Sequence, residues 1–496
     1  MPFKAYFLSA VIATLLWGCR KDTLITDDPG ARLVLTEDTI LFDTIFTTVG
    51  SVTKRFTVRN ENENAVSVDI ALVGGTPSPY RINVDGAAGT AFTDVEILGG
   101  DSIFIFVEAT LGQNNANDPF ILEDRISFNT NGNLQEVLLL AWGQDAHFYR
   151  PDQFIPGLPA FSYIAGGLDQ NGNQICETVV WPNDKPYVIF GYAVVDECCK
   201  LVIQPGVKVY FHGGGGLWVY VNGQIEAVGT VEERITFQGD RLEAQYADLP
   251  NQWDRIWINE GTENNRLENC VIKNALIGLQ AQTFPLTSGQ PLSSNTLFLK
   301  NVSINNCFTA GLYSENYRIT ATNLLVGDAG QYSVVLTGSG KYDFNHSTIG
   351  NYWGFEIRQD PAFLLTNRFT DAFGAGQVRE ILTSEFGNGI VYGNNTNEFQ
   401  LDLDAGQPTD VRFLNNLFRT DQATDGTLFP GPIYRNQQPG FVDASAGDLH
   451  LTATAFAKSK ASQPVETDAL QDLDGAFRPN PDADFAPDLG CYEQHD

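Results

Sequence analysis

Basic residues and histidine are scarce in this sequence of 496 residues. It holds 30 Lys and Arg against 60 Asp and Glu, which gives a formal net charge of −30. A surface this acidic repels phosphate backbones, so no nucleic-acid partner is expected. The histidines are widely scattered, and neither a zinc-site spacing nor a catalytic-triad spacing is present among them. They are His147, His212, His346, His450 and His495.

Long hydrophobic runs are also missing. The apolar run from Ala5 to Gly18 follows Lys4 and is too short to span a bilayer, which is typical of a signal peptide. The glycine run from Gly213 to Gly216 lacks a following Lys-Ser/Thr pair, so it predicts a turn and not a phosphate-binding loop.

The apolar run ends in Leu16-Trp-Gly-Cys19, which resembles the lipobox of bacterial lipoproteins. In that family the cysteine is lipidated and becomes the new N-terminus. The resemblance implies a signal peptide at 1–18, a lipid on Cys19 that holds the protein at a membrane, and a tether at 19–31. Arg20-Lys-Asp22 resembles the short charged signal that sends Bacteroidetes lipoproteins to the cell surface. It implies an outer-membrane, surface-exposed location.

One short pattern recurs four times, with the template Asn/His-x-x-Val/Ile-x-Asn/Asp, and begins at Asn269, Asn301, Asn323 and His346. The steps are 32, 22 and 23 residues (301−269, 323−301, 346−323), a length typical of one coil of a β-solenoid. The fourth residue of each repeat should face the core. The sixth residues should form a column that bonds along its length and to turn backbone groups. These sixth residues are Asn274, Asn306, Asp328 and Asn351.

The composition and patterning predict an all-β fold. Short alternating strands at 32–150 indicate an Ig-like β-sandwich, and strand-turn repeats indicate a β-helix at 155–440. Lines such as Leu217-Trp-Val-Tyr-Val and Gln252-Trp-Asp-Arg-Ile-Trp-Ile resemble the right-handed parallel β-helix lipoproteins of Bacteroidetes, within the pectate-lyase-like superfamily. Residues 360–384 should project as a loop. The segment 441–496 resembles the closing segment of bacterial β-helix proteins and should cover the open end of the helix.

Apart from Cys19, six cysteines remain in a compartment that permits disulfides. Cys270 and Cys307 occupy different positions of their repeats, so we predict no bridge between them, with Cys307 beside Ala275. Cys270 should be a buried thiol. Cys176 with Cys198 or Cys199 is the expected bridge.

The family resemblance raises the question of catalysis. Lyases of this fold hold Ca²⁺ with several carboxylates, and hydrolases use two or three carboxylates near one strand face. The signature motifs of polygalacturonases and pectate lyases are absent. We therefore expect no cofactor and no metal, with Ca²⁺ as the alternative. If the protein is a lyase or hydrolase, its carboxylates should come from the densest acidic group of the β-helix. That group is Asp240, Glu243, Asp248, Asp254 and Glu260.

Aromatic residues fall in successive repeats and could stack on sugar rings. The candidates for glycan stacking are Tyr313, Tyr332, Tyr342 and Tyr352, with Trp353 turned toward the core. Three functional interpretations follow. The favoured one is a non-catalytic surface lipoprotein whose β-helix binds glycans or other cell-surface polymers. The others are a polysaccharide lyase or hydrolase and a structural scaffold of an envelope complex.

Overall fold

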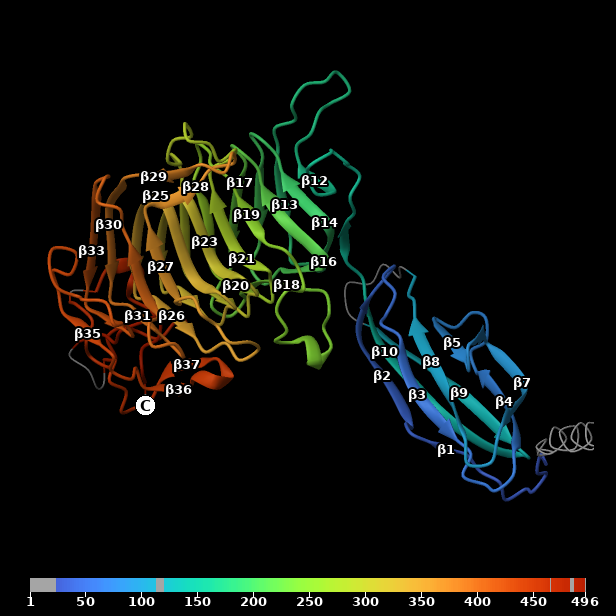
Figure 1. Ribbon diagram of the computed structural model, residues 1–496. Coiled ribbons are helices and arrows are strands. Elements are labelled where there is room, and N and C mark those ends of the chain that lie inside the picture. The colour runs from blue at the N-terminus through green and yellow to red at the C-terminus, as the bar shows by residue number, and fades with distance from the viewer. Residues whose placement is uncertain (1–23, 113–119, 464, 482–485, 496) are drawn as a thin grey trace, which may run out of the picture. The chain divides into compact units, whose positions relative to one another are not determined.

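The computed structural model describes residues 24–112, 120–463, 465–481 and 486–495. The chain divides after Asp145 into two units, each with its own hydrophobic core. Cys19 and the rest of 1–23 lie outside the described residues. The predicted all-β fold, a parallel β-helix preceded by a β-sandwich, is confirmed (Figure 1). In the described ranges, no helix has the length and apolar character needed to cross a membrane.

The N-terminal unit is a sandwich of two five-stranded sheets. One sheet holds β1 (Val34–Leu35), β3 (Lys54–Arg59), β8 (Ser102–Ala109), β5 (Tyr80–Val84) and β6 (Ala87–Gly89), and the other holds β2 (Thr39–Phe46), β10 (Asn133–Gln144), β9 (Phe120–Thr130), β4 (Val66–Leu72) and β7 (Ala91–Ile97). Their sequences alternate because successive side chains of a strand point to opposite faces. In β8, Ile103, Ile105 and Val107 are buried while Ser102 and Phe104 are exposed.

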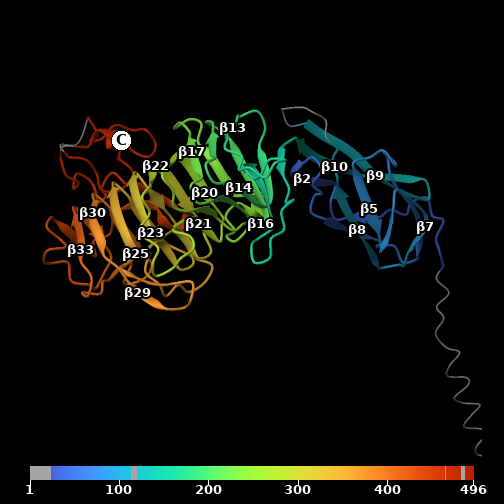
Figure 2. The ribbon, with the colours of Figure 1, turned by 90° about the horizontal axis from the view of Figure 1, so that it is seen from above.

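The second unit is the parallel β-helix, whose coils stack side by side in Figures 1 and 2. Its 23 strands follow one another in chain order. They are β11 (His147–Tyr149), β12 (Phe161–Ala165), β13 (Thr178–Trp181), β14 (Tyr187–Val195), β15 (Lys200–Ile203), β16 (Lys208–Val219), β17 (Gln224–Val228), β18 (Ile235–Gly239), β19 (Ile256–Ile258), β20 (Asn265–Lys273), β21 (Ile277–Gln282), β22 (Thr296–Asn305), β23 (Ala310–Thr322), β24 (Leu325–Val326), β25 (Tyr332–Asn345), β26 (Thr348–Asn351), β27 (Phe363–Thr366), β30 (Ile381–Gly387), β31 (Ile390–Gly393), β32 (Phe399–Asp402), β33 (Thr409–Leu414), β34 (Asn416–Phe418) and β35 (Ile433–Arg435).

The remaining elements are short. They are the antiparallel pairs β28 (Arg368–Thr370) with β29 (Gly376–Val378) and β36 (Phe441–Asp443) with β37 (Asp448–Leu451), and the 3₁₀ turns Ala244–Tyr246, Ala444–Ala446 and Thr467–Ala469.

The repeat register is confirmed strand by strand. Ile272 pairs with Ile304, Ile304 with Val326, and Val326 with Ile349. All four side chains lie in the β-helix core. Burying an Ile or Val side chain stabilises a protein by about 1.5–3 kcal/mol, so this column is a substantial part of what holds the coils together.

The first residue of each repeat forms the corner between two strands. Asn269, Asn301, Asn323 and His346 have φ between 50° and 53°, a left-handed conformation that Asn, Asp and His tolerate better than other side chains. Asn301 Nδ2 donates to Asn269 Oδ1 at 3.1 Å, and Asn323 Nδ2 donates to Asn301 Oδ1 at 2.9 Å. The amide ladder therefore runs through the first position of the repeat.

The sixth position was predicted to bond along its own column, and this was wrong. The side chains at this position bond to backbone groups of turns, and this part of the prediction is confirmed. Asn274 Nδ2 donates to Ala247 O at 2.9 Å, and Asn351 Nδ2 donates to Ala329 O at 2.9 Å. The reason is local, because these residues sit at the turn after the strand, where unpaired carbonyls are closer than the next coil's amide.

The cysteine predictions hold. Cys176 is bonded to Cys198, with 5.2 Å between their Cα atoms, while Cys199 is a buried free thiol. Cys270 and Cys307 are buried and unbridged. Phe308 N donates to Ala275 O at 2.9 Å, which places Cys307 beside Ala275.

The segment at 360–384 is only partly a loop. Phe363 and Leu365 of β27 point into the core, and β27 pairs with β25 and β32 as a strand of the helix. The β28–β29 hairpin does project, and Arg379 after it donates to Ser288 O at 2.7 Å, which ties it to the loop after β21. The short apolar run Phe363-Leu-Leu365, which is consistent with a buried strand, was overlooked in the sequence.

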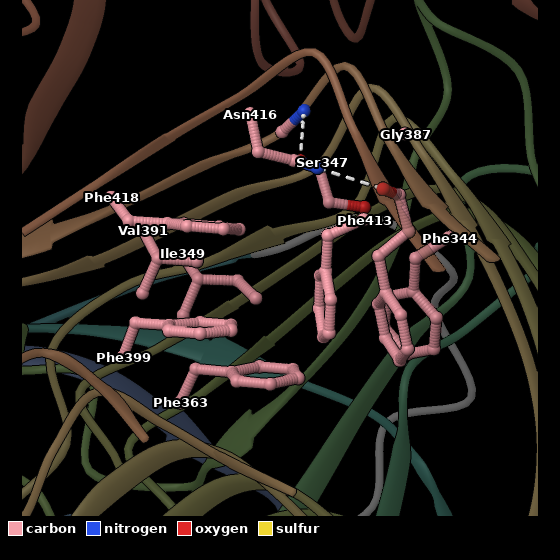
Figure 3. A pocket seen from close by; sticks show the side chains of 12 residues that line it. Phe344, Ser347, Ile349, Phe363, Gly387, Val391, Phe399, Phe413, Asn416 and Phe418 are labelled. Carbon is pink, nitrogen blue, oxygen red and sulfur yellow. Dashed lines mark hydrogen bonds between the residues drawn. The ribbon is translucent and has the colours of Figure 1, made fainter. Parts of the chain in front are cut away.

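Aromatic rings fill the C-terminal coils. Phe363 stacks on Phe399 at 5.5 Å between ring centroids, and Phe399 stacks on Phe418 at 4.0 Å. They line a small apolar cavity of about 20 Å³, seen in Figure 3 with Phe344 and Phe413 on its other side. Phe429 stacks on Phe413 at 5.4 Å, so the segment before β35 is what covers the last rings.

The C-terminal segment was predicted to cover the open end of the helix, and this was wrong. It lies along the flank that carries the amide ladder. Arg478 Nη1 donates to Asn323 Oδ1 at 2.8 Å, Cys491 N donates to Thr348 Oγ1 at 3.0 Å, and Gly490 N donates to Asn388 O at 2.8 Å. The physical reason is that the ladder leaves unpaired acceptors along this flank. We call residues 441–495 the flank segment.

Candidate functional site

A groove of about 490 Å³ lies between the coils and the flank segment, a volume usual for ligand sites. It is assembled from parts that are far apart in the sequence. Its lining residues are Asp248, Lys273, Asn305, Asn306, Gly327, Asp328, Tyr352, Gly354, Phe355, Ala444, Ser445, Ala446, Gly447 and Leu449. Two residues predicted from the sequence line this groove: Asp248, from the acidic group, and Tyr352, from the glycan-stacking tyrosines.

The floor of the groove is made by the fifth and sixth residues of successive repeats. Lys273, Asn305 and Gly327 hold the fifth position, and Asn306 and Asp328 hold the sixth. Gly327 allows a close approach there, because a Cβ on it would lie 2.1 Å from Asn305 Oδ1 and that side chain would have to move. At one wall, Gly350 also holds the fifth position, and a Cβ on it would lie 2.5 Å from Leu449 Cδ1 of the flank segment.

Asp328 is the carboxylate in the floor. Its Oδ1 accepts a hydrogen bond from Tyr352 N at 2.6 Å. Burial raises the pKa of the Asp328 carboxyl, against the lowering effects of that hydrogen bond and of the Arg358 guanidinium. Within the described ranges no side chain or backbone group donates to Oδ2. That oxygen is left for a ligand.

Tyr352 supplies the aromatic surface. It is half-buried, with its ring edge-on to Phe441 of the flank segment at 6.3 Å, while Trp353 is buried, as predicted. The Tyr352 hydroxyl has no hydrogen-bond partner among the residues that the structure describes. A ring with a free hydroxyl can both pack on and bond to a sugar.

Three more polar groups of the groove are available. Neither the Asn306 amide nor the Asp248 carboxylate bonds to another group in the described part of the chain. Lys273 Nζ donates to Ala247 O at 3.4 Å and forms no ion pair with a described carboxylate. The groove thus offers donors, acceptors and one aromatic face together.

The predicted acidic group does not converge. Asp240 bonds to His212 Nδ1 at 2.6 Å, Glu243 pairs with Arg241 at 3.1 Å, and Asp254 pairs with Arg255 at 2.8 Å. Glu260 accepts Phe284 N at 2.6 Å, and only Asp248 lines the groove. Across the described ranges, no group of three His, Cys, Asp or Glu side chains is placed to hold a metal ion.

The four tyrosines do not form one platform. Tyr342 is 1% exposed and pairs with Ile319 in the interior, so its predicted stacking role is wrong. Tyr342 has the same parity along β25 as the core residues Val334, Leu336 and Phe344, so the ordinary alternation of the strand places it inside. Tyr313 and Tyr332 pack in one small cluster with Val335, away from Tyr352. Tyr352 alone lines the groove.

A second aromatic cluster, outside the β-helix core, was missed in the sequence. On the outer face of the helix Trp218 stacks on Trp257 at 4.8 Å, with Phe284 against both rings. Farther along the same face, Tyr313 donates to Glu315 Oε2 at 3.2 Å, and burial raises the pKa of Glu315 to about 7. The alternation in Leu217-Trp-Val-Tyr-Val already signalled an outward Trp218.

No protein-family profile matches this chain, and no curated protein matches its sequence. Matching solved structures include a family 123 glycoside hydrolase from Clostridium perfringens, with 9% identity, 23% of this chain and 26% of that chain covered, and a TM-score of 0.18. The E. coli chaperone DraB has 11% identity, 23% and 55% coverage, and a TM-score of 0.17. A Porphyromonas gingivalis W83 protein of unknown function has 12% identity, 30% and 59% coverage, and a TM-score of 0.18.

This chain thus spans between 26% and 59% of the length of those structures. At such low TM-scores the likenesses carry no argument about fold or function.

Proposed function

We propose that this protein is a lipid-anchored protein of the bacterial outer-membrane surface whose β-helix binds glycans without cleaving them, and that the groove is the binding site. Support for the anchor comes from the lipobox-like sequence that ends at Cys19. Support for glycan binding comes from the groove, where an aromatic ring lies with amide and carboxylate groups that keep free hydrogen-bonding capacity and with the Lys273 ammonium group, which forms no ion pair with a described carboxylate. Sugar hydroxyls both donate and accept, so they need such a mixture.

One observation carries the proposal. Three of the four repeats have Asn at the sixth position, and only the third has Asp, at 328. An Asn there could accept the same hydrogen bond from Tyr352 N without a buried charge. The fold therefore does not need the carboxylate, whose raised pKa shows that folding disfavours its charged form. Residues that lower the stability of a fold are typical of binding sites, because binding needs their chemistry. Asp328 fits this description.

Asp328→Asn should weaken glycan binding by roughly tenfold or more, because a hydrogen bond to a charged group contributes about 1.5–3 kcal/mol. At neutral pH the same variant should be at least as stable as the unchanged protein. Burial raises the folded-state pKa of Asp328, so the ionised carboxylate lowers the free energy of unfolding at neutral pH. This loss is relieved as the pH falls toward the usual Asp range. The stability difference should shrink as the pH falls through the raised pKa of Asp328, and it should be gone below a pH of about 4.

Calorimetric titration of the detergent-solubilised full chain with a glycan found on a polysaccharide array measures the binding. Thermal unfolding at several pH values measures the stability. Asp410→Asn is the control, since Asp410 is an exposed carboxylate of a surface ion pair. Unchanged affinity in Asp328→Asn would contradict the proposal. Shortened polysaccharide products would favour a lyase or hydrolase, and failure to bind any glycan would favour a scaffold.

Cys19→Ala should remove the protein from the outer-membrane fraction, because several acyl chains on one cysteine give stable anchoring that a single polar N-terminus cannot. Membrane fractionation, with metabolic labelling by a fatty acid, measures the loss. Cys307→Ala is the matched control, since that thiol is buried in the helix core. Outer-membrane partition that persists in Cys19→Ala would rule out the lipid as the anchor.

A further inference from the structure

We infer that the groove takes uncharged sugar residues and excludes uronic acids, an inference that rests on the proposed function. The starting point is the charge inside the groove. Asp248 and Asp328 bring two carboxylates against one ammonium group, that of Lys273. Lys273 Nζ is held 3.4 Å from Ala247 O, next to Asp248 in the chain. A ligand that reaches the lysine therefore enters a groove that is also lined by two carboxylates.

The position of Asp328 makes the repulsion effective. It lies in the floor, where partial burial leaves its charge less screened than that of a carboxylate on the open surface. A uronate in the groove would bring a carboxylate next to Asp328 Oδ2, which no described group neutralises through a hydrogen bond. The whole chain adds to the effect, because its formal net charge of −30 repels polyanions before they reach the surface.

The unpaired groups suit hydroxyls instead. Asp328 Oδ2 can accept from a sugar hydroxyl, the Asn306 amide can donate and accept, and the Tyr352 hydroxyl can do both. Gly327 lets the Asn305 side chain lie close over the floor, beside these groups, because a Cβ on Gly327 would lie 2.1 Å from Asn305 Oδ1. None of these contacts requires a charge on the ligand.

The test compares neutral and acidic glycans on the same protein. The detergent-solubilised full chain is titrated with mannan, xylan and β-glucan oligosaccharides and with oligogalacturonate and alginate, at low and at high salt. We expect binding to one of the neutral oligosaccharides with little salt dependence, and no binding of either uronate at low salt. The double variant Asp248→Asn/Asp328→Asn should lose affinity for the neutral ligand and gain at least tenfold in affinity for a uronate.

The outcomes separate the inference from the proposed function. Uronate binding by the unchanged protein at low salt would overturn the inference and leave glycan binding standing. Neutral binding that the double variant does not alter would also overturn it, since the groove would then not be the site. Binding to no glycan of either kind would overturn the proposed function itself.

Discussion

Ile304→Asp should lower the free energy of unfolding of the β-helix by on the order of 4 kcal/mol or more, because it places an unpaired charge in the core. Ile304 is fully buried, and it pairs with Ile272 on one side and Val326 on the other. Its strand partners in the described part of the chain are aliphatic core side chains, which cannot compensate a carboxylate. The expected measurement is a large drop in the midpoint of the β-helix unfolding transition.

The adjacent residue gives the matched control. Asn305 is half-exposed on the other face of the same strand, and its Nδ2 donates to Ser303 Oγ at 2.6 Å. In Asn305→Asp the Ser303 hydroxyl can donate instead, so stability should change by less than about 0.5 kcal/mol. Equal losses in the two variants would show that the two faces of the strand are wrongly assigned.

Arg478→Met should cost about 3–5 kcal/mol, the range found when one partner of a buried ion pair is removed. The Arg478 side chain is fully buried, and its Nε lies 3.4 Å from Glu493 Oε2. Its guanidinium also donates to Asn323 Oδ1 at 2.8 Å and to Gly490 O at 3.2 Å. Removing it leaves a buried carboxylate and several unpaired acceptors.

The loss should be local to the flank segment. Hydrogen exchange should speed up at Asn480 and Asp488, whose N–H groups donate to the Glu493 carboxylate at 2.9 Å each. Arg266→Met is the control, because Arg266 pairs with Glu268 at the surface with 53% of its side chain exposed, and such pairs contribute less than about 1 kcal/mol. Similar small losses in both variants would show that Arg478 does not hold the flank segment.

The flank segment has little regular structure, and acidic side chains take the place of strand partners. Asp472 accepts Ala476 N and Glu493 N at 2.8 Å each, and Asp488 accepts Ser459 N at 2.7 Å. Buried backbone N–H groups must be paired, and carboxylates do this where no strand is adjacent. This accounts for acidic residues that a sequence analysis would assign to solvent.

What the sequence by itself determined is the local pattern. The spacing from Asn269 to His346 fixed the coil register, because identical short strands stack only when their buried residues align, as Ile304 does on Ile272. The same register correctly kept Cys270 and Cys307 apart, and the parity of Tyr352 and Trp353 was correct. These are properties of neighbouring residues in one strand or in adjacent coils.

Only the tertiary structure decided which residues form the candidate site. The interior position of Tyr342 did not depend on it, because Tyr342 shares parity with the core residues Leu336 and Phe344, and the alternation of β25 already indicated an inward side chain. The groove joins Asp248, Asp328 and Leu449, which lie on separate loops, coils and the flank segment. Loops reach a surface by packing that no local pattern encodes. The candidate site therefore appears only when the chain is folded.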